Sequence, residues 1–159
     1  MEKLLDLNLY VSQTALKTFD EYYADGIIKQ DSGDFDGALI EYSRAIELNP
    51  NFVDSYINRG LVKQSLKDYA GAMIDYNKAI EIKPDSYSYM NRAILKHELK
   101  EFEFAIKDFD LAMISDNKES SIKDKIYYNK GNSLASLEDY YGAISSYKKA
   151  IDINSNYAF

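Results

Sequence analysis

The sequence predicts an all-α protein built from four helical repeats, and two observations support that prediction. Four times along the chain, an alanine is followed four residues later by an aromatic residue and three residues after that by a second alanine. The sets are Ala38/Tyr42/Ala45, Ala72/Tyr76/Ala79, Ala105/Phe109/Ala112 and Ala143/Tyr147/Ala150. Successive sets are 34, 33 and 38 residues apart, a period typical of proteins in which one helix pair stacks on the next. The 7 glycines and 2 prolines are few for 159 residues, which also favours long helices.

The first helix of each repeat is expected to run for about thirteen residues, because apolar side chains recur there at helical spacing. The predicted starts are Phe19, Val53, Ser86 and Asp124. A small residue occupies one position in every first helix, namely Gly26, Gly60, Ala93 and Gly131. Two helices approach closely only where side chains are short, so this column predicts the point where an aromatic residue of the second helix packs.

The second helix of each repeat is expected after a short turn. The predicted starts are Phe35, Tyr69, Phe102 and Tyr140, each directly preceded by an acidic residue: Asp34, Asp68, Glu101 and Asp139. Unpaired backbone N–H groups and the helix dipole favour negative charge at a helix start. Pro50 and Pro84 close the first two repeats, because proline cannot continue a helix.

Both ends of the chain depart from the repeat pattern. In residues 1–18, Leu5, Leu9 and Leu16 fall on one helical face, which predicts a capping helix over the first repeat and about nine helices in all. The last residues resemble the start of a further repeat. The second helix of the fourth repeat would then expose one face, formed by Ile144, Tyr147 and Ile151. We expect a fragment of a longer array, with pairing of this face to another molecule as the alternative.

The predicted organisation follows from these boundaries. It comprises a capping helix at 1–18, repeats at 19–52, 53–85, 86–119 and 124–157, an insertion at 120–123, and a truncated further unit at 158–159. The polar stretch 116–123 lengthens the step between the third and fourth repeats. We expect a tolerated surface insertion there, with a functional loop as the alternative.

Composition and charge exclude several classes of function. A net charge of −7 disfavours nucleic acid and anionic membranes as main partners, since both are bound by an excess of Lys and Arg. The absence of cysteine removes disulfides, thiolate metal sites and a cysteine nucleophile. No apolar run is long enough for a signal sequence or a membrane span. A cytoplasmic protein without membrane insertion is the expectation.

The repeated columns resemble those of the tetratricopeptide repeat (TPR) family. The first two repeats carry it most fully, as Tyr22, Gly26, Phe35, Ala38, Tyr42, Ala45, Pro50 and as Tyr56, Gly60, Tyr69, Ala72, Tyr76, Ala79, Pro84, and the resemblance covers residues 19–157. It implies antiparallel helix pairs stacked into a right-handed superhelical solenoid. It also implies a concave groove, lined mainly by first helices, that holds a peptide or partner segment. The chain departs from the family pattern at Lys29, where the family often has tyrosine. The same position holds Lys63, Lys96 and Leu134 in the later repeats.

The groove residues implied by this resemblance come from the first helices. They are Tyr23, Ile27, Asp54, Ile57, Asn58, Leu61, Tyr87, Met90, Asn91, Ile94, His97, Lys125, Tyr128, Asn129 and Asn132. Their middle is apolar and aromatic, with amides beside it. Amides at one-repeat spacing suit the backbone of an extended peptide, and apolar residues offer side-chain pockets. The alternative is that the asparagines bond within their own helix pair.

Two more specific ligands are disfavoured. Chaperone-binding TPR domains grip a carboxylate with lysine, arginine and asparagine, whereas the matching positions here retain only Asn58. A basic column, Arg59, Arg92 and Lys130, is expected to pair with acids such as Asp75 or Asp108 rather than with an acidic ligand.

The sequence therefore predicts a protein-interaction module without enzymatic activity, cofactor or metal. One histidine, His97, and no cysteine provide neither a zinc site nor a catalytic triad. The expected partner is a protein or peptide. The alternatives are a TPR array that regulates or positions an enzyme in a longer polypeptide, and a structural protein that self-associates through its C-terminal face.

Overall fold

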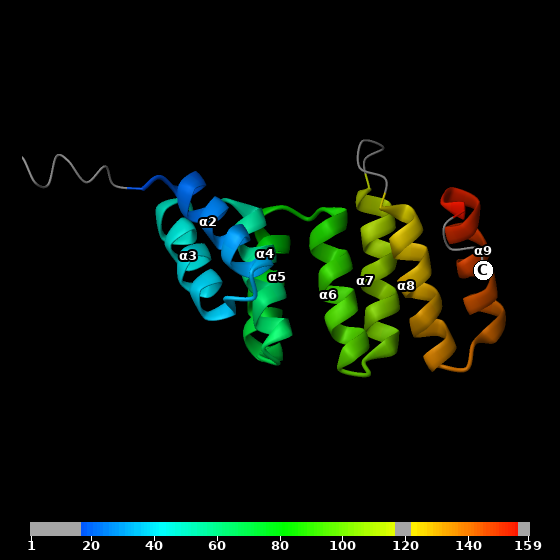
Figure 1. Ribbon diagram of the computed structural model, residues 1–159. Helices are drawn as coiled ribbons and strands as arrows, with labels where there is room; N and C mark the ends of the chain where they lie inside the picture. Colours follow the sequence, from blue (N-terminus) through cyan, green and yellow to red (C-terminus); the bar gives the residue numbers. More distant parts are fainter. Residues whose placement is uncertain (1–16, 117–121, 156–159) are drawn as a thin grey trace, which may run out of the picture. The chain divides into compact units, whose positions relative to one another are not determined.

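Eight α-helices and no strand are present in the residues that the computed structural model describes, 17–116 and 122–155 (Figure 1). They are α2 (Phe19–Asp31), α3 (Phe35–Leu48), α4 (Val53–Ser65), α5 (Tyr69–Ile82), α6 (Ser86–Glu98), α7 (Phe102–Ser115), α8 (Lys123–Ser136) and α9 (Tyr140–Ile153). The predicted all-α fold is confirmed, and so are the starts of seven helices. The eighth, α8, begins at Lys123, one residue before the expected Asp124.

Consecutive helices pack as four antiparallel pairs: α2 with α3, α4 with α5, α6 with α7 and α8 with α9 (Figure 1). The chain reverses within each pair through three residues, such as 66–68 between α4 and α5. The middle residue of every turn has positive φ: Gly33 (82°), Lys67 (66°), Lys100 (63°) and Glu138 (63°). Only the first of these is a glycine, so three turns hold an ordinary side chain in a left-handed conformation that costs free energy.

Aspartate caps three of the four second helices. The carboxylates of Asp34, Asp68 and Asp139 accept hydrogen bonds from the backbone N–H three residues on, at 2.9–3.0 Å. That third residue is glycine in all three helices, because a Cβ there would overlap the capping carboxylate. In α7 both partners differ: Glu101 makes no side-chain cap and Phe104 replaces the glycine.

The alanine and aromatic columns form the seam between the helices of a pair. The alanines and the aromatic residue are fully buried in α3, α5 and α7, while in α9 Tyr147 is half-buried. The small column lies opposite these rings: a Cβ at Gly60 would lie 2.6 Å from Cε1 of Tyr76. The predicted close approach at the small residues is therefore confirmed.

The described residues divide into two compact units between Pro50 and Asn51, and each unit is described by itself. The first contains α2 and α3. In the second, the first helices of the repeats, α4, α6 and α8, contact one another in order. Each second helix packs against its own first helix, and α5 and α7 also pack against the first helix that follows. This arrangement gives the second unit two layers, one of first helices and one of second helices.

Several predicted features at the ends and at the insertion fall outside the described residues. Of the expected capping helix at 1–18 only Lys17 and Thr18 are described, and Thr18 is the N-cap of α2 in a capping box with Glu21. Of the predicted insertion at 120–123, residues 120 and 121 are outside the described part, whereas Ile122 is the N-cap of α8 and Lys123 is its first residue. Residues 156–159 include the predicted further unit.

Candidate functional site

The predicted groove residues of the second unit lie on the first-helix layer formed by α4, α6 and α8. Exposed among them are Asp54, Tyr87, Lys125 and Tyr128; half-buried are Asn58, Leu61, Ile94, His97, Asn129 and Asn132. Tyr23 and Ile27 are half-buried on α2 and belong to the first unit. The layer therefore presents tyrosine rings and amides, with a charged residue at the start of α4 and of α8.

Three predicted groove residues are buried instead. Ile57, Met90 and Asn91 are each less than a tenth exposed. Met90 belongs to a core cluster with Phe109 on α7 and with Ile126 on the adjoining first helix, α8. The apolar pockets expected from Ile57 and Met90 are thus filled by the protein's own packing.

The asparagines of α6 and α8 make the same local contact. The Nδ2 of Asn91 donates to the backbone oxygen of Tyr87 at 3.0 Å, and that of Asn129 to the oxygen of Lys125 at 2.8 Å. Each bond spans four residues within one helix, so both amides are held in the same orientation. The expectation that these side chains bond within their own helix pair holds for the Nδ2 groups. Asn58 occupies the equivalent place on α4.

His97 joins the third repeat to the fourth. Its Nδ1 lies 3.0 Å from the hydroxyl of Ser133 on α8, and its ring is 5.2 Å from that of Phe102. In the first two repeats a glutamine at this position accepts from a tyrosine hydroxyl: Gln30 from Tyr42 and Gln64 from Tyr76, at 2.8 and 2.9 Å. Phe109 has no hydroxyl, and His97 bonds across the repeat boundary instead.

A buried carboxylate lies between the two helices of the second repeat and of the third. Asp75 accepts from Arg59 at 2.7 and 3.0 Å and pairs with Lys63 at 2.8 Å. Asp108 is held in the same way by Arg92 and Lys96. The predicted pairing of Arg59 and Arg92 with these acids is confirmed. Sequence reasoning missed that the two lysines converge on the same carboxylates.

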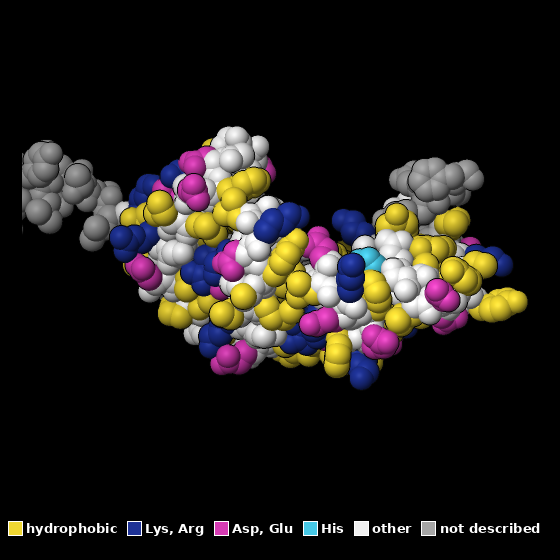
Figure 2. All heavy atoms as spheres, turned by 90° about the horizontal axis from the view of Figure 1, so that it is seen from below, with side chains coloured by type: hydrophobic (Ala, Val, Ile, Leu, Met, Phe, Trp, Pro, Cys, Tyr) yellow, Lys and Arg dark blue, Asp and Glu magenta, His cyan; other side chains and the backbone are white. Residues whose placement is uncertain are grey.

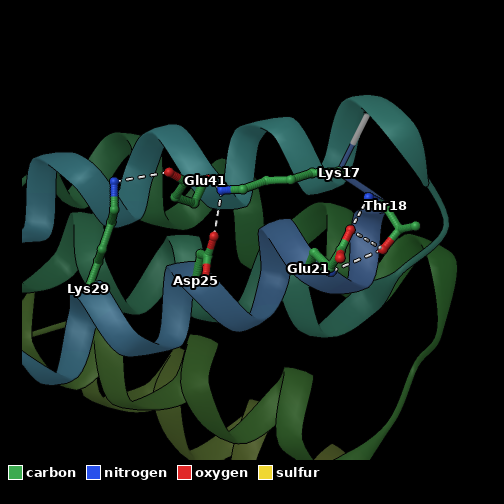
Figure 3. Close-up of polar contacts among 6 residues, drawn as sticks. All are labelled: Lys17, Thr18, Glu21, Asp25, Lys29 and Glu41. Atoms are coloured by element: carbon green, nitrogen blue, oxygen red, sulfur yellow. Dashed lines mark hydrogen bonds and ion pairs between the residues drawn. The ribbon is translucent and has the colours of Figure 1, made fainter. Parts of the chain in front are cut away.

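The first unit contains a variant of this cluster (Figure 3). Glu41 takes the place of the aspartate, and one of its oxygens lies 2.9 Å from Nζ of Lys29. Lys17 lies 3.6 Å from the other oxygen and also donates to Asp25, a hydrogen bond that raises the pKa of Lys17. Asp25 stands where the next two repeats have arginine, so Lys17 supplies the second cation.

The fourth repeat lacks the cluster altogether. Ser146 and Leu134 replace the aspartate and the lysine, and Lys130 pairs with Asp110 on α7. A signal for the cluster was therefore present in the sequence. In the first three repeats the first helix has a lysine where the second helix has an acid. In the fourth repeat the same two positions hold leucine and serine.

Charged side chains of both signs are spread over the surface. On the face seen in Figure 2, acidic and basic side chains are interspersed with hydrophobic ones. In residues 17–116 and 122–155, no three His, Cys, Asp or Glu side chains are grouped to hold a metal ion. No helix in this part of the chain has the length and apolar character needed to cross a bilayer.

Comparisons with known proteins agree with the fold. Residues 53–86 and 124–157 match a family model described as "Tetratricopeptide repeat", and residues 28–67 match one described as "TPR repeat". A search of curated proteins found no match.

Three solved structures illustrate the structural likeness. A crystal structure of MamA is 23% identical, with a TM-score of 0.70, over 82% of this chain and 74% of that one. MamA from Desulfovibrio magneticus RS-1 is 19% identical, with a TM-score of 0.73, over 89% and 78%. PilF from Pseudomonas aeruginosa is 20% identical, with a TM-score of 0.81, over 87% and 62%. At these identities the likeness concerns the fold.

Proposed function

The chain belongs to the tetratricopeptide repeat family, whose members present surfaces to protein partners, and we propose that this one binds an extended peptide along α4, α6 and α8. The proposed function is non-catalytic. Side-chain amides of the protein form hydrogen bonds with the main chain of the peptide, and tyrosine rings contact its side chains. No step of bond making or breaking is involved.

The half-buried amide of Asn129, together with the exposed rings of Tyr87 and Tyr128, is the observation that carries this proposal. The Asn129 amide is fixed by a bond to its own helix, so little conformational entropy is lost when its remaining hydrogen-bonding atoms engage a ligand. An amide at this place suits the donors and acceptors of an extended backbone, and the half-buried Asn58 occupies the equivalent place on α4. Tyr87 and Tyr128 are 42% and 38% exposed and provide large contact area with a polar end.

The charges of the layer favour a ligand segment without a terminal carboxylate. Binding of a carboxylate depends on cationic donors. In α4 and α6 the arginines and lysines nearest the layer are already paired with Asp75 and Asp108. An internal segment with apolar or aromatic side chains is therefore the preferred ligand.

Selection from a phage-displayed library of random linear peptides tests this proposal. Peptides enriched on the wild-type chain should bind the double variant Tyr87→Ala/Tyr128→Ala at least about 10-fold more weakly, because two aromatic contacts are lost. The helical circular dichroism signal of the variant should be unchanged.

Tyr141 provides a matched control. It is 91% exposed and lies on α9, outside the first-helix layer. Peptide binding should survive Tyr141→Ala. Failure to enrich any peptide, or equal binding by the double variant, would overturn the proposal.

A further inference from the structure

One second helix carries an apolar stripe on its solvent side. On α7, the side chains of Phe104, Leu111 and Ile114 are 55%, 40% and 81% exposed. Lys107 completes the stripe, with its Nζ 5.4 Å from the centre of the Phe104 ring. The spacings of 3, 4 and 3 residues place all four on one face of the helix, over a length of about 15 Å.

The stripe is peculiar to the third repeat. The position of Leu111 holds a cation in the other second helices, and that of Ile114 holds an acid. In α3 and α5 these residues form ion pairs, Arg44–Glu47 at 2.7 Å and Lys78–Glu81 at 2.8 Å. The third repeat has thus exchanged a solvated charge pair for two aliphatic side chains. It has also exchanged the capping glycine for Phe104.

The charges beside the stripe are suited to a copy of itself. Lys107 stacks on Phe104 and has no ion pair with any described residue. Asp110 lies next to Leu111 and its side chain is 53% exposed, although one oxygen already binds Lys130. A stripe thus bordered by a cation and an acid can meet an inverted copy with opposite charges facing.

We propose that α7 pairs with α7 of a second copy of this chain, in an antiparallel contact about a two-fold axis. The spacing of the stripe reads the same in both directions, so one axis places Phe104 opposite the other copy's Ile114 and Lys107 opposite its Leu111. Such a contact is isologous, because each copy uses the same patch. The aliphatic part of the Lys107 side chain covers Leu111 of the second copy, and its ammonium group reaches Asp110 of that copy.

The association is expected to be weak. A single stripe of this length buries less than the area of a standard stable interface. The dimer therefore forms at high protein concentration, and analytical ultracentrifugation over a range up to about 1 mM measures it. The inference is independent of the peptide-binding proposal, since it uses the layer of second helices.

The first test gives α7 the charge pair of α5. In the double variant Leu111→Lys/Ile114→Glu, both changes lie at exposed positions, so the fold should persist. Its dimer dissociation constant should rise about 10-fold or more, because two apolar side chains no longer leave water. Ile144→Glu, at an exposed position of α9, is the control and should leave the constant unchanged.

The second test exchanges charges. Lys107→Asp and Asp110→Lys should each weaken self-association, because like charges then face each other across the axis. An equimolar mixture of the two variants should form a heterodimer in which both opposite pairs are restored.

Three results would overturn the proposal. They are a chain that remains monomeric over the whole concentration range, a dimer unaffected by Leu111→Lys/Ile114→Glu, and a dimer dissociated by Ile144→Glu instead. Mixed charge variants that remain monomeric would rule out the antiparallel register.

Discussion

At the scale of single residues, the tyrosine of the seam both packs its ring between the helices and forms a hydrogen bond with its hydroxyl. The small residue opposite the ring leaves room for both. The ring of Tyr76 fills the space that Gly60 leaves, and its hydroxyl reaches through to Gln64. The hydroxyl is therefore removed from water but keeps a hydrogen-bond partner, as buried polar groups require.

This environment predicts an alkaline weakening of the fold. Burial, with the nearby carboxylates of Glu98 and Asp75, raises the pKa of Tyr76. Above pH ~10, the usual pKa of tyrosine, the unfolded chain releases this proton while the folded chain keeps it. The unfolded state then binds fewer protons, so the free energy of unfolding falls as pH rises.

Urea unfolding measured between pH 8 and pH 11 checks this expectation. In Tyr76→Phe the fall with pH should be smaller than in the wild type. At pH 8 the variant should be about 1 kcal/mol less stable, because the bond to Gln64 is lost. Tyr141→Phe, which changes an exposed hydroxyl, should follow the wild-type profile. Parallel profiles for Tyr76→Phe and the wild type would refute the assignment.

At the scale of helices, the columns that pack were predictable, and so was the pairing of Arg59 with Asp75 and of Arg92 with Asp108. Alanine and aromatic spacing located the second helices, since burial imposes a helical period on apolar residues. The acids before Phe35, Tyr69 and Tyr140 were correctly identified as helix starts. Glu101 also stands directly before its helix as predicted, and it is the N-cap of α7 without a side-chain hydrogen bond.

The other contacts of the polar clusters needed three-dimensional information. Arg59 and Lys63 are four residues apart on one helix, and the spacing does not reveal that Asp75 receives both. The bond from His97 to Ser133 spans 36 residues and a repeat boundary. Burial of Met90 was missed because it depends on the neighbouring first helix, which the repeat register alone does not locate.

The caps give a prediction with an internal control. Asp68→Ala should lower the free energy of unfolding by about 1 kcal/mol, because the N–H of Gly71 loses its acceptor. Glu101→Ala removes no side-chain cap and should be nearly neutral. Thermal or denaturant unfolding of both variants decides the matter. Equal losses would mean that the charge near the helix start, rather than the hydrogen bond, stabilises these helices.

At the scale of the molecule, repeats within residues 51–155 are joined by a few polar bonds between neighbours. Arg92 on α6 donates to Asn77 on α5, and Lys130 on α8 pairs with Asp110 on α7. His97 and Ser133 link α6 to α8. In repeat proteins such nearest-neighbour contacts determine how far local unfolding spreads.

Ser133→Ala is expected to loosen the fourth repeat selectively. Amide hydrogen exchange in α8 and α9 should quicken by about fivefold, equivalent to the loss of one buried hydrogen bond. Exchange in α4 and α5 should be unchanged. Ser136→Ala is the control, because Ser136 bonds only back to Asn132 of its own helix. A uniform increase across α4 to α9 would show that these helices unfold as one cooperative unit.

Peptide binding by the layer of first helices can be observed directly. The most direct measurement is an NMR titration with an enriched peptide, at a protein concentration below that of self-association. The largest shift changes should appear at the side-chain amide of Asn129 and along α4, α6 and α8. Changes confined to α5, α7 and α9, with the Asn129 amide resonances unmoved, would show that the peptide does not bind the layer of first helices.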